Sequence, residues 1–97
     1  MLTATQIRYL KSEAHHIDAL YQIGKNKLGD TQLELLRNGI NARELIKVKV
    51  LKNAEIDLDD FAMELAVALN ADLIDVKGHT VTLFKKKAKE SSFKLPK

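Results

Sequence analysis

Residues 45–52, LIKVKVLK, contain the clearest secondary-structure pattern in the sequence. Ile46, Val48 and Val50 alternate with Lys47 and Lys49, and a period of two is that of a β-strand, whose successive side chains point to opposite faces. The pattern predicts a strand with one apolar and one basic face. The solvated side of a half-buried strand is the ordinary interpretation of such lysines, and contact with a polyanion is the alternative.

Helices are predicted before and after this strand. Thr31-Gln32-Leu33-Glu34 has the form of a capping box and begins an apolar stripe that continues to Ile40, although Gly39 weakens the helix. Asp57 is expected to cap a helix that ends near Leu69, and acidic residues favour the N-terminal half of that helix. An earlier capping box, Thr3-Ala4-Thr5-Gln6, opens a helix that ends near His15.

Three further strands complete the expected architecture. Residues 17–23 are a short apolar stretch closed by Gly24, which predicts a buried strand. Residues 73–77 and 80–85 predict a hairpin about Gly78-His79. The order is α-β-α-β-α-β-β, and strands joined through helices are expected to be parallel with right-handed crossovers. The second and third helices should therefore share one face of the sheet, with a single antiparallel strand at the end.

Length and composition restrict the possible classes of protein. Ninety-seven residues, 45% of them hydrophobic, suffice for one core, so we expect one domain over residues 1–86 and a basic, disordered tail over residues 87–97. The sequence has no cysteine, which excludes thiolate chemistry and favours a cytoplasmic protein. The N-terminal residues lack a signal-peptide pattern, and no stretch approaches the ~18 apolar residues of a membrane span. No membrane association is expected.

Charge is strongly segregated along the chain. Residues 1–52 carry nine Lys or Arg and five acidic residues, residues 53–84 carry one Lys and seven acidic residues, and residues 85–97 carry six Lys and one Glu. A polyanion is therefore expected to contact the first half, the tail or both. The alternative is that the segregation is accidental and that all parts are merely solvated.

Four stretches occur in a fixed order and at characteristic separations. They are Ala14-His15-His16, Gln22-Ile23-Gly24-Lys25-Asn26, residues 44–50, and Gly78-His79-Thr80-Val81 with Leu83. Together they resemble the YhbY-like (CRM domain) family of RNA-binding ribosome-assembly proteins over nearly the whole domain. The resemblance implies a two-layer α/β sandwich with a four-stranded mixed sheet, like the C-terminal domain of translation initiation factor three. It also implies binding of ribosomal RNA in precursors of the large ribosomal subunit, and no catalysis.

The resemblance further implies a phosphate-binding loop between the first strand and the second helix, where the family usually has Gly-x-x-Gly. Here the loop reads Gly24-Lys25-Asn26-Lys27, and the next glycine is Gly29. Lys27 cannot let the backbone approach a phosphate as glycine does, but it can add a cation to the contact. We therefore expect an electrostatic role for the loop. An ordinary turn with solvated lysines is the alternative.

Four more cations complete the predicted RNA-binding set. Arg8 and Lys11 share the outer face of the first helix, and Lys47 and Lys49 lie on the basic face of the central strand. If these side chains face the same way as Lys25, they form one patch, and each phosphate that the patch neutralises steepens the salt dependence of binding.

The histidines do not predict a metal or catalytic site. His15 and His16 are adjacent on a helix end, where neighbouring side chains diverge by about 100° and do not readily chelate one ion. One of the two is instead expected to cap the last carbonyls of the helix.

A second class of function is a protein-interaction adaptor, in which the acidic helix over residues 57–69 docks a basic ribosomal protein or assembly factor. A small-molecule enzyme is disfavoured, because the sequence has no nucleophile and base pair, no glycine-rich nucleotide fingerprint and no carboxylate pair in an apolar setting. We expect no cofactor, no metal and no small-molecule substrate, and a monomer away from the ribosome.

Overall fold

The helices and strands follow the predicted order. The structure, a computed structural model, describes residues 2–23, 29–51 and 57–86. The elements are α1 (Ala4–Ala14), β1 (Tyr21–Ile23), α2 (Asp30–Arg43), β2 (Leu45–Val50), α3 (Leu58–Leu69), β3 (Asp72–Lys77) and β4 (Thr80–Phe84). The predicted α/β class and element order are confirmed.

The four strands form one mixed sheet in the order β1-β2-β4-β3. β1 pairs parallel with β2, whereas β4 pairs antiparallel with both β2 and β3. The first three strands therefore run in one direction, and β4 is the single antiparallel strand, as predicted. β4 does not lie at an edge of the sheet. It fills the position between β2 and β3, so the last strand of the chain is one of the two central ones.

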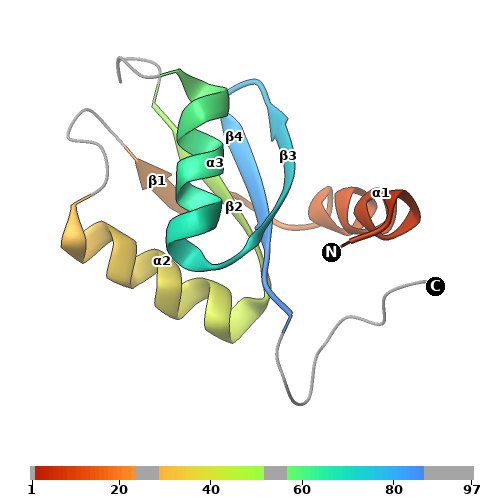
Figure 1. Cartoon of the computed structure of the whole chain (residues 1–97), viewed down its shortest axis with the longest axis horizontal. Coiled ribbons are helices and arrows are strands. Elements are labelled where there is room, and N and C mark those ends of the chain that lie inside the picture. Colours follow the sequence, from red (N-terminus) through yellow and green to blue (C-terminus); the bar gives the residue numbers. More distant parts are fainter. Residues whose placement is uncertain (1, 24–28, 52–56, 87–97) are drawn as a thin grey trace.

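One face of the sheet is covered by α2 and α3, as predicted (Figure 1). The main apolar core lies between these two layers. Its sheet residues include Ile46, Val48 and Val50 of β2 and Val81 and Leu83 of β4, and its helix residues include Leu36, Ile40, Phe61, Leu65 and Leu69. Because side chains alternate along a strand, burial of Ile46, Val48 and Val50 directs Lys47 and Lys49 to the opposite face.

Helix α1 covers only one end of that opposite face. A smaller apolar cluster joins Leu10 and Ala14 of α1 to Leu45, Ile74 and Phe84 of the sheet. The predicted capping box begins the helix, because the Gln6 N–H donates to the Thr3 hydroxyl and the Thr3 N–H donates to the Gln6 side chain. Beyond this cluster, no helix of the described ranges covers the rest of the face, which we call the open face.

Strand β1 is shorter than predicted, and it lies at the edge of the sheet. Only Tyr21–Ile23 pair with β2, and Gln22 is exposed. The carbonyl of Ile17 accepts a hydrogen bond from the Lys47 side chain instead of from a neighbouring strand. The prediction of a buried strand over residues 17–23 was therefore wrong in extent, because the first apolar residues of that stretch connect α1 to the sheet edge.

Helix α2 begins before the predicted capping box. Gly29, in an extended conformation, is the N-cap, and its N–H donates to the Gln32 side chain at 3.2 Å. The prediction that Thr31 caps the helix was wrong, because Gln32 reaches back to the residue three positions before it and Asp30 in the first turn favours the positive end of the helix dipole.

Gly39 lies where α2 approaches β1. A Cβ at position 39 would lie 2.6 Å from Cζ of Tyr21 and closer still to the hydroxyl oxygen. The glycine that weakens the helix in isolation therefore leaves room for the Tyr21 ring in the folded chain.

Candidate nucleic-acid interface

One row of polar residues crosses all four strands on the open face. Lys49 of β2 is aligned with Gln22 of β1 and with Thr80 of β4, and Thr80 is aligned with Lys77 of β3. Lys49, Lys77 and Gln22 are exposed. The row therefore presents two ammonium groups, separated by one hydroxyl-bearing residue, on the open face of the sheet.

A β-bulge determines which residues of β3 reach this face. Leu73 is aligned with Leu83, but the next aligned pair is Asp75 with Thr82, so Ile74 is an extra residue. Leu73 packs on the main core, whereas Ile74 joins the α1 cluster and Asp75 also lies on the α1 side. Simple alternation would have placed Asp75 and Lys77 on the same side as Leu73. The bulge brings both of them to the open face.

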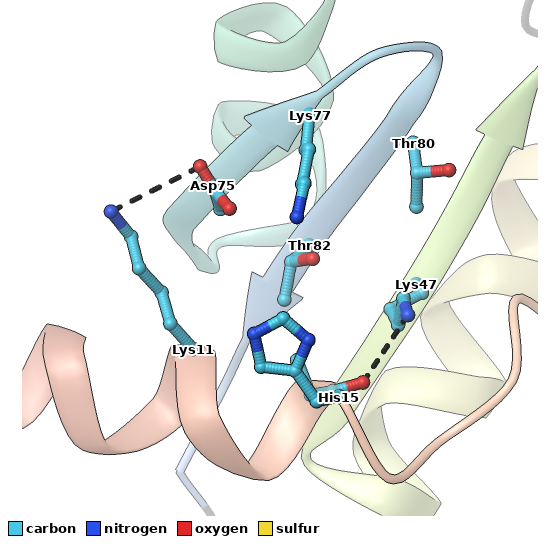
Figure 2. A pocket seen from close by; sticks show the side chains of 8 residues that line it. Lys11, His15, Lys47, Asp75, Lys77, Thr80 and Thr82 are labelled. Atoms are coloured by element: carbon cyan, nitrogen blue, oxygen red, sulfur yellow. Dashed lines mark hydrogen bonds and ion pairs between the residues drawn. The ribbon is translucent and has the colours of Figure 1, made fainter.

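A shallow cavity of about 170 Å³ lies between the open face and the end of α1 (Figure 2). Most of its lining side chains carry an ammonium, an imidazole or a hydroxyl group. The lining residues are Lys11, Ala14, His15, Lys47, Asp75, Lys77, Thr80 and Thr82. Cationic and hydroxyl donors around one cavity fit an anion with several acceptor oxygens, such as a phosphate group. We call this site the basic cavity.

Lys47 holds one wall of the basic cavity in place. Its Nζ donates to the carbonyl oxygens of Ala14 and Ile17, at 3.2 Å each (Figure 2 marks the bond to Ala14). Ala14 is the last residue of α1, where the helix dipole is negative, and Ile17 follows three residues later in the connection to β1. The cation predicted to contact RNA is thus engaged within the fold. It takes the carbonyl-capping role that was predicted for a histidine.

Lys11 is held much more loosely. Its Nζ lies 4.0 Å from Oδ1 of Asp75, with 46% of the Lys11 side chain and 35% of the Asp75 side chain exposed. A long ion pair in such an exposed setting contributes little to stability, since water screens it. Figure 2 shows Lys11 on α1, across the cavity from Lys77 and Lys47. The Lys11 ammonium therefore remains accessible to an incoming anion.

The other predicted RNA-binding residues have different positions. Arg8 is exposed one helical turn before Lys11, on the same side of α1. Lys49 lies in the polar row next to the basic cavity. The loop Gly24-Lys25-Asn26-Lys27 falls outside the described residues. Its electrostatic role therefore stays a prediction, although the chain enters it from Ile23, which is aligned with Val50, the residue after Lys49.

Sequence reasoning missed several residues that the structure brings to this surface. Lys77, Thr80 and Thr82 were assigned to strands but not to a site. The alternation of Thr80 and Thr82 with Val81 and Leu83 is a polar and apolar pattern that indicates an open face for β4. No such local signal exists for Lys77, because its direction depends on the bulge.

Two negative findings apply to residues 2–23, 29–51 and 57–86. No group of three or more histidine or acidic side chains in these ranges could hold a metal ion. Likewise, none of the helices found there has the length and apolar character required to cross a membrane.

The family model of the CRS1/YhbY (CRM) domain matches residues 2–85. The chain belongs to this family. The match includes every helix and strand described above, so the polar row and the basic cavity are features of a CRM domain.

Curated relatives agree with this assignment. The CRM domain chain is 38% identical over 96 residues to the "Probable RNA-binding protein YqeI" of Bacillus subtilis. The alignment covers 99% of this chain and 100% of that relative. It is 37% identical over 86 residues to a "Probable RNA-binding protein" of Methanocaldococcus jannaschii, covering 87% of this chain and 63% of that longer relative. An "RNA-binding protein" of Haemophilus influenzae is 30% identical over 97 residues. That alignment covers 99% of this chain and 96% of the relative.

A solved structure shares the fold of this CRM domain. The solution structure of a hypothetical Staphylococcus aureus protein, whose proposed role is RNA binding, superposes with a TM-score of 0.84 at 35% identity. The superposition covers 99% of this chain and 100% of that one.

Proposed function

We propose that this CRM domain protein binds ribosomal RNA in precursors of the large ribosomal subunit and assists their assembly, as a monomer in the cytoplasm. The observation that carries the proposal is the open face, where Lys49, Lys77 and Lys11 lie around the hydroxyl groups of Thr80 and Thr82. The relatives named as RNA-binding proteins support the choice of RNA as the polyanion.

The mechanism is chiefly electrostatic. RNA backbone phosphates would contact the exposed ammonium groups of Lys49, Lys77 and Lys11, and the hydroxyl groups of Thr80 and Thr82 would donate further hydrogen bonds. Each phosphate that is neutralised releases condensed counterions, which makes binding steeply dependent on salt. The lysines of the loop over residues 24–27 extend this contact in our proposal.

Binding is tested by a salt titration of the protein against fragments of large-subunit ribosomal RNA. We expect affinity to fall steeply between low and physiological salt. Arg37→Gln is the matched control for Lys49→Gln, because Arg37 is an exposed cation on α2, the helix layer on the other side of the sheet. Affinity that is independent of salt, or an equal loss in both variants, would count against the open face.

The role in assembly needs a separate experiment. Crosslinking in cells, followed by mapping of the bound RNA, should recover precursor large-subunit RNA. Recovery of unrelated transcripts at the same frequency would leave RNA binding intact and refute the assembly role.

A second candidate function is that of an adaptor that docks a basic protein on α3. Met63 and Val67 are 62% and 79% exposed on this helix, and the exposed acidic side chains of Asp59, Asp60 and Glu64 accompany them. Exposed apolar groups ringed by one sign of charge are typical of protein contacts. Purification from nuclease-treated lysate separates the candidates, because an RNA binder loses the ribosomal particle and an adaptor keeps its protein partner.

A further inference from the structure

A second cavity lies beside the basic cavity, where the chain passes from α1 to the sheet edge. Its volume is about 430 Å³, which is within the size range of ordinary small-molecule sites. Its lining includes the side chains of Ile17, Leu20 and Tyr21 on one side and of Arg43, at the end of α2, on another. The cavity is therefore a groove between the connection that precedes β1 and the turn that leads into β2.

The groove combines an apolar lining with polar groups. Ile17, Leu20 and Tyr21 contribute aliphatic and aromatic surface, and Leu20 is 59% exposed. Asp18 and Arg43, both exposed, add a hydrogen-bond acceptor and a planar cationic donor. Within the described ranges, no hydrogen bond or ion pair engages the Arg43 guanidinium. A flat ring with polar edges matches this lining better than a purely aliphatic ligand does.

The groove and the basic cavity share one lining residue, Lys47, so they lie next to each other on either side of its side chain. Because the Lys47 ammonium is held by the carbonyls of Ala14 and Ile17, this shared wall has a defined position. A cavity suited to a phosphate thus adjoins a groove suited to an aromatic ring. A single nucleotide joins these two groups covalently.

We propose that the groove receives the base of an unpaired nucleotide, one of whose flanking phosphates occupies the basic cavity. The proposal rests on the RNA-binding function proposed above, and it names the class of RNA: strands with an unstacked base, as in loops, bulges and ends. Bases inside a duplex are stacked and paired and cannot enter such a groove, whereas splayed bases commonly stack on aromatic rings or arginine planes. The groove then adds a base contact to the phosphate contacts of the open face.

The test compares two RNA probes of equal length and charge at physiological salt. One is a ten-nucleotide single strand of mixed sequence, and the other replaces its central nucleotides by abasic ribose phosphates. We expect the strand with bases to bind about tenfold more tightly, within the range that one stacked base contributes.

The variant Leu20→Ser tests whether the groove holds the base. Leu35→Ser on α2 is the matched control, because both leucines are 59% exposed. Leu20→Ser should remove most of the difference between the two probes while leaving the affinity for the abasic strand unchanged. Leu35→Ser should leave both affinities unchanged. Unaltered binding of the abasic strand also demonstrates that the Leu20 variant is folded.

The other outcomes overturn the proposal in distinguishable ways. Equal affinity of wild-type protein for both probes refutes base binding in the groove and leaves RNA binding intact. Absence of binding to both probes refutes the base contact alone if a large-subunit ribosomal RNA fragment still binds, and it refutes the proposed function as well if that fragment does not bind. If sedimentation shows a dimer that Leu20→Ser dissociates, the groove belongs to a second copy of the chain and not to a base.

Discussion

The Nζ atom of Lys47 lies 3.2 Å from the carbonyl oxygen of Ala14, a residue 33 positions earlier in the chain. This contact joins the centre of the sheet to the end of α1, and the same Nζ also holds the carbonyl of Ile17. It therefore determines where α1 ends relative to the open face. The two cavities lie on either side of this one side chain.

Substitution of Lys47 is expected to affect stability more than substitution of Lys49. Lys47→Met removes a charged donor from the carbonyls of Ala14 and Ile17 and should lower the free energy of unfolding by about 1–2 kcal/mol. Lys49→Met, at an exposed position, should change it by less than about 0.5 kcal/mol. Urea unfolding monitored by circular dichroism measures both. Equal losses would mean that the Lys47 hydrogen bonds contribute nothing net.

RNA binding through the open face is expected to depend on its exposed lysines. Lys49→Gln combined with Lys77→Gln should weaken binding to a ribosomal RNA fragment and lower the log–log salt slope by about two units for a duplex contact, one for each cation. The melting temperature should stay nearly constant, because both side chains are exposed. An unchanged slope would place the phosphate contacts elsewhere on the molecule.

Gly39→Ala tests the close approach of α2 to β1. Alanine favours an isolated helix by about 1 kcal/mol over glycine, but here its Cβ would collide with the Tyr21 ring, and overpacking costs about 1–3 kcal/mol. We expect a net loss of stability in the wild-type chain. In a Tyr21→Ala background the same change should become stabilising, and chemical unfolding of all four proteins measures the coupling. A stabilising effect in both backgrounds would show that the ring moves aside freely.

Lys27→Gly separates a backbone contact from an electrostatic one in the loop over residues 24–27. If Lys27 itself contacts a phosphate, the change should weaken binding by about 1 kcal/mol or less and lower the salt slope by about one unit. We favour this outcome, because a lysine at this position already blocks the approach that glycine allows. Tighter binding with an unchanged slope would instead indicate a backbone clamp.

Tyr9 should ionise at unusually high pH. Burial raises the pKa of Tyr9 above its ordinary 10.0, and the hydrogen bond to Glu13 and the Glu13 charge raise it further. The neutral phenol is thus favoured in the folded state, so its stabilisation is complete below pH 10 and is lost as pH rises through the folded pKa. Absorbance of tyrosinate in a Tyr21→Phe background measures this pKa. Glu13→Gln should lower it, and no change would exclude Glu13 as a cause.

The sequence by itself determined the elements whose signals are local. The alternation over residues 45–50 placed the strand and its two faces, and the caps at Thr3 and Asp57 began two helices, as the structure has them. The motif resemblance identified the family, which the match over residues 2–85 confirmed. These features could be predicted because hydrophobic period and capping involve residues only a few positions apart.

Tertiary structure alone decided how these elements form a surface. Strand β4 lies between β2 and β3, and the bulge at Ile74 brings Asp75 and Lys77 to the open face. Lys47 was expected on the solvated basic face of its strand, and it is instead half-buried against the end of α1, while its contact with RNA stays a prediction. Each of these outcomes depends on which distant segments pair and on which polar groups their contact leaves without partners. Local pattern carries no information on either, because strand order and the hydrogen bonds of buried polar groups are settled only when the layers pack together.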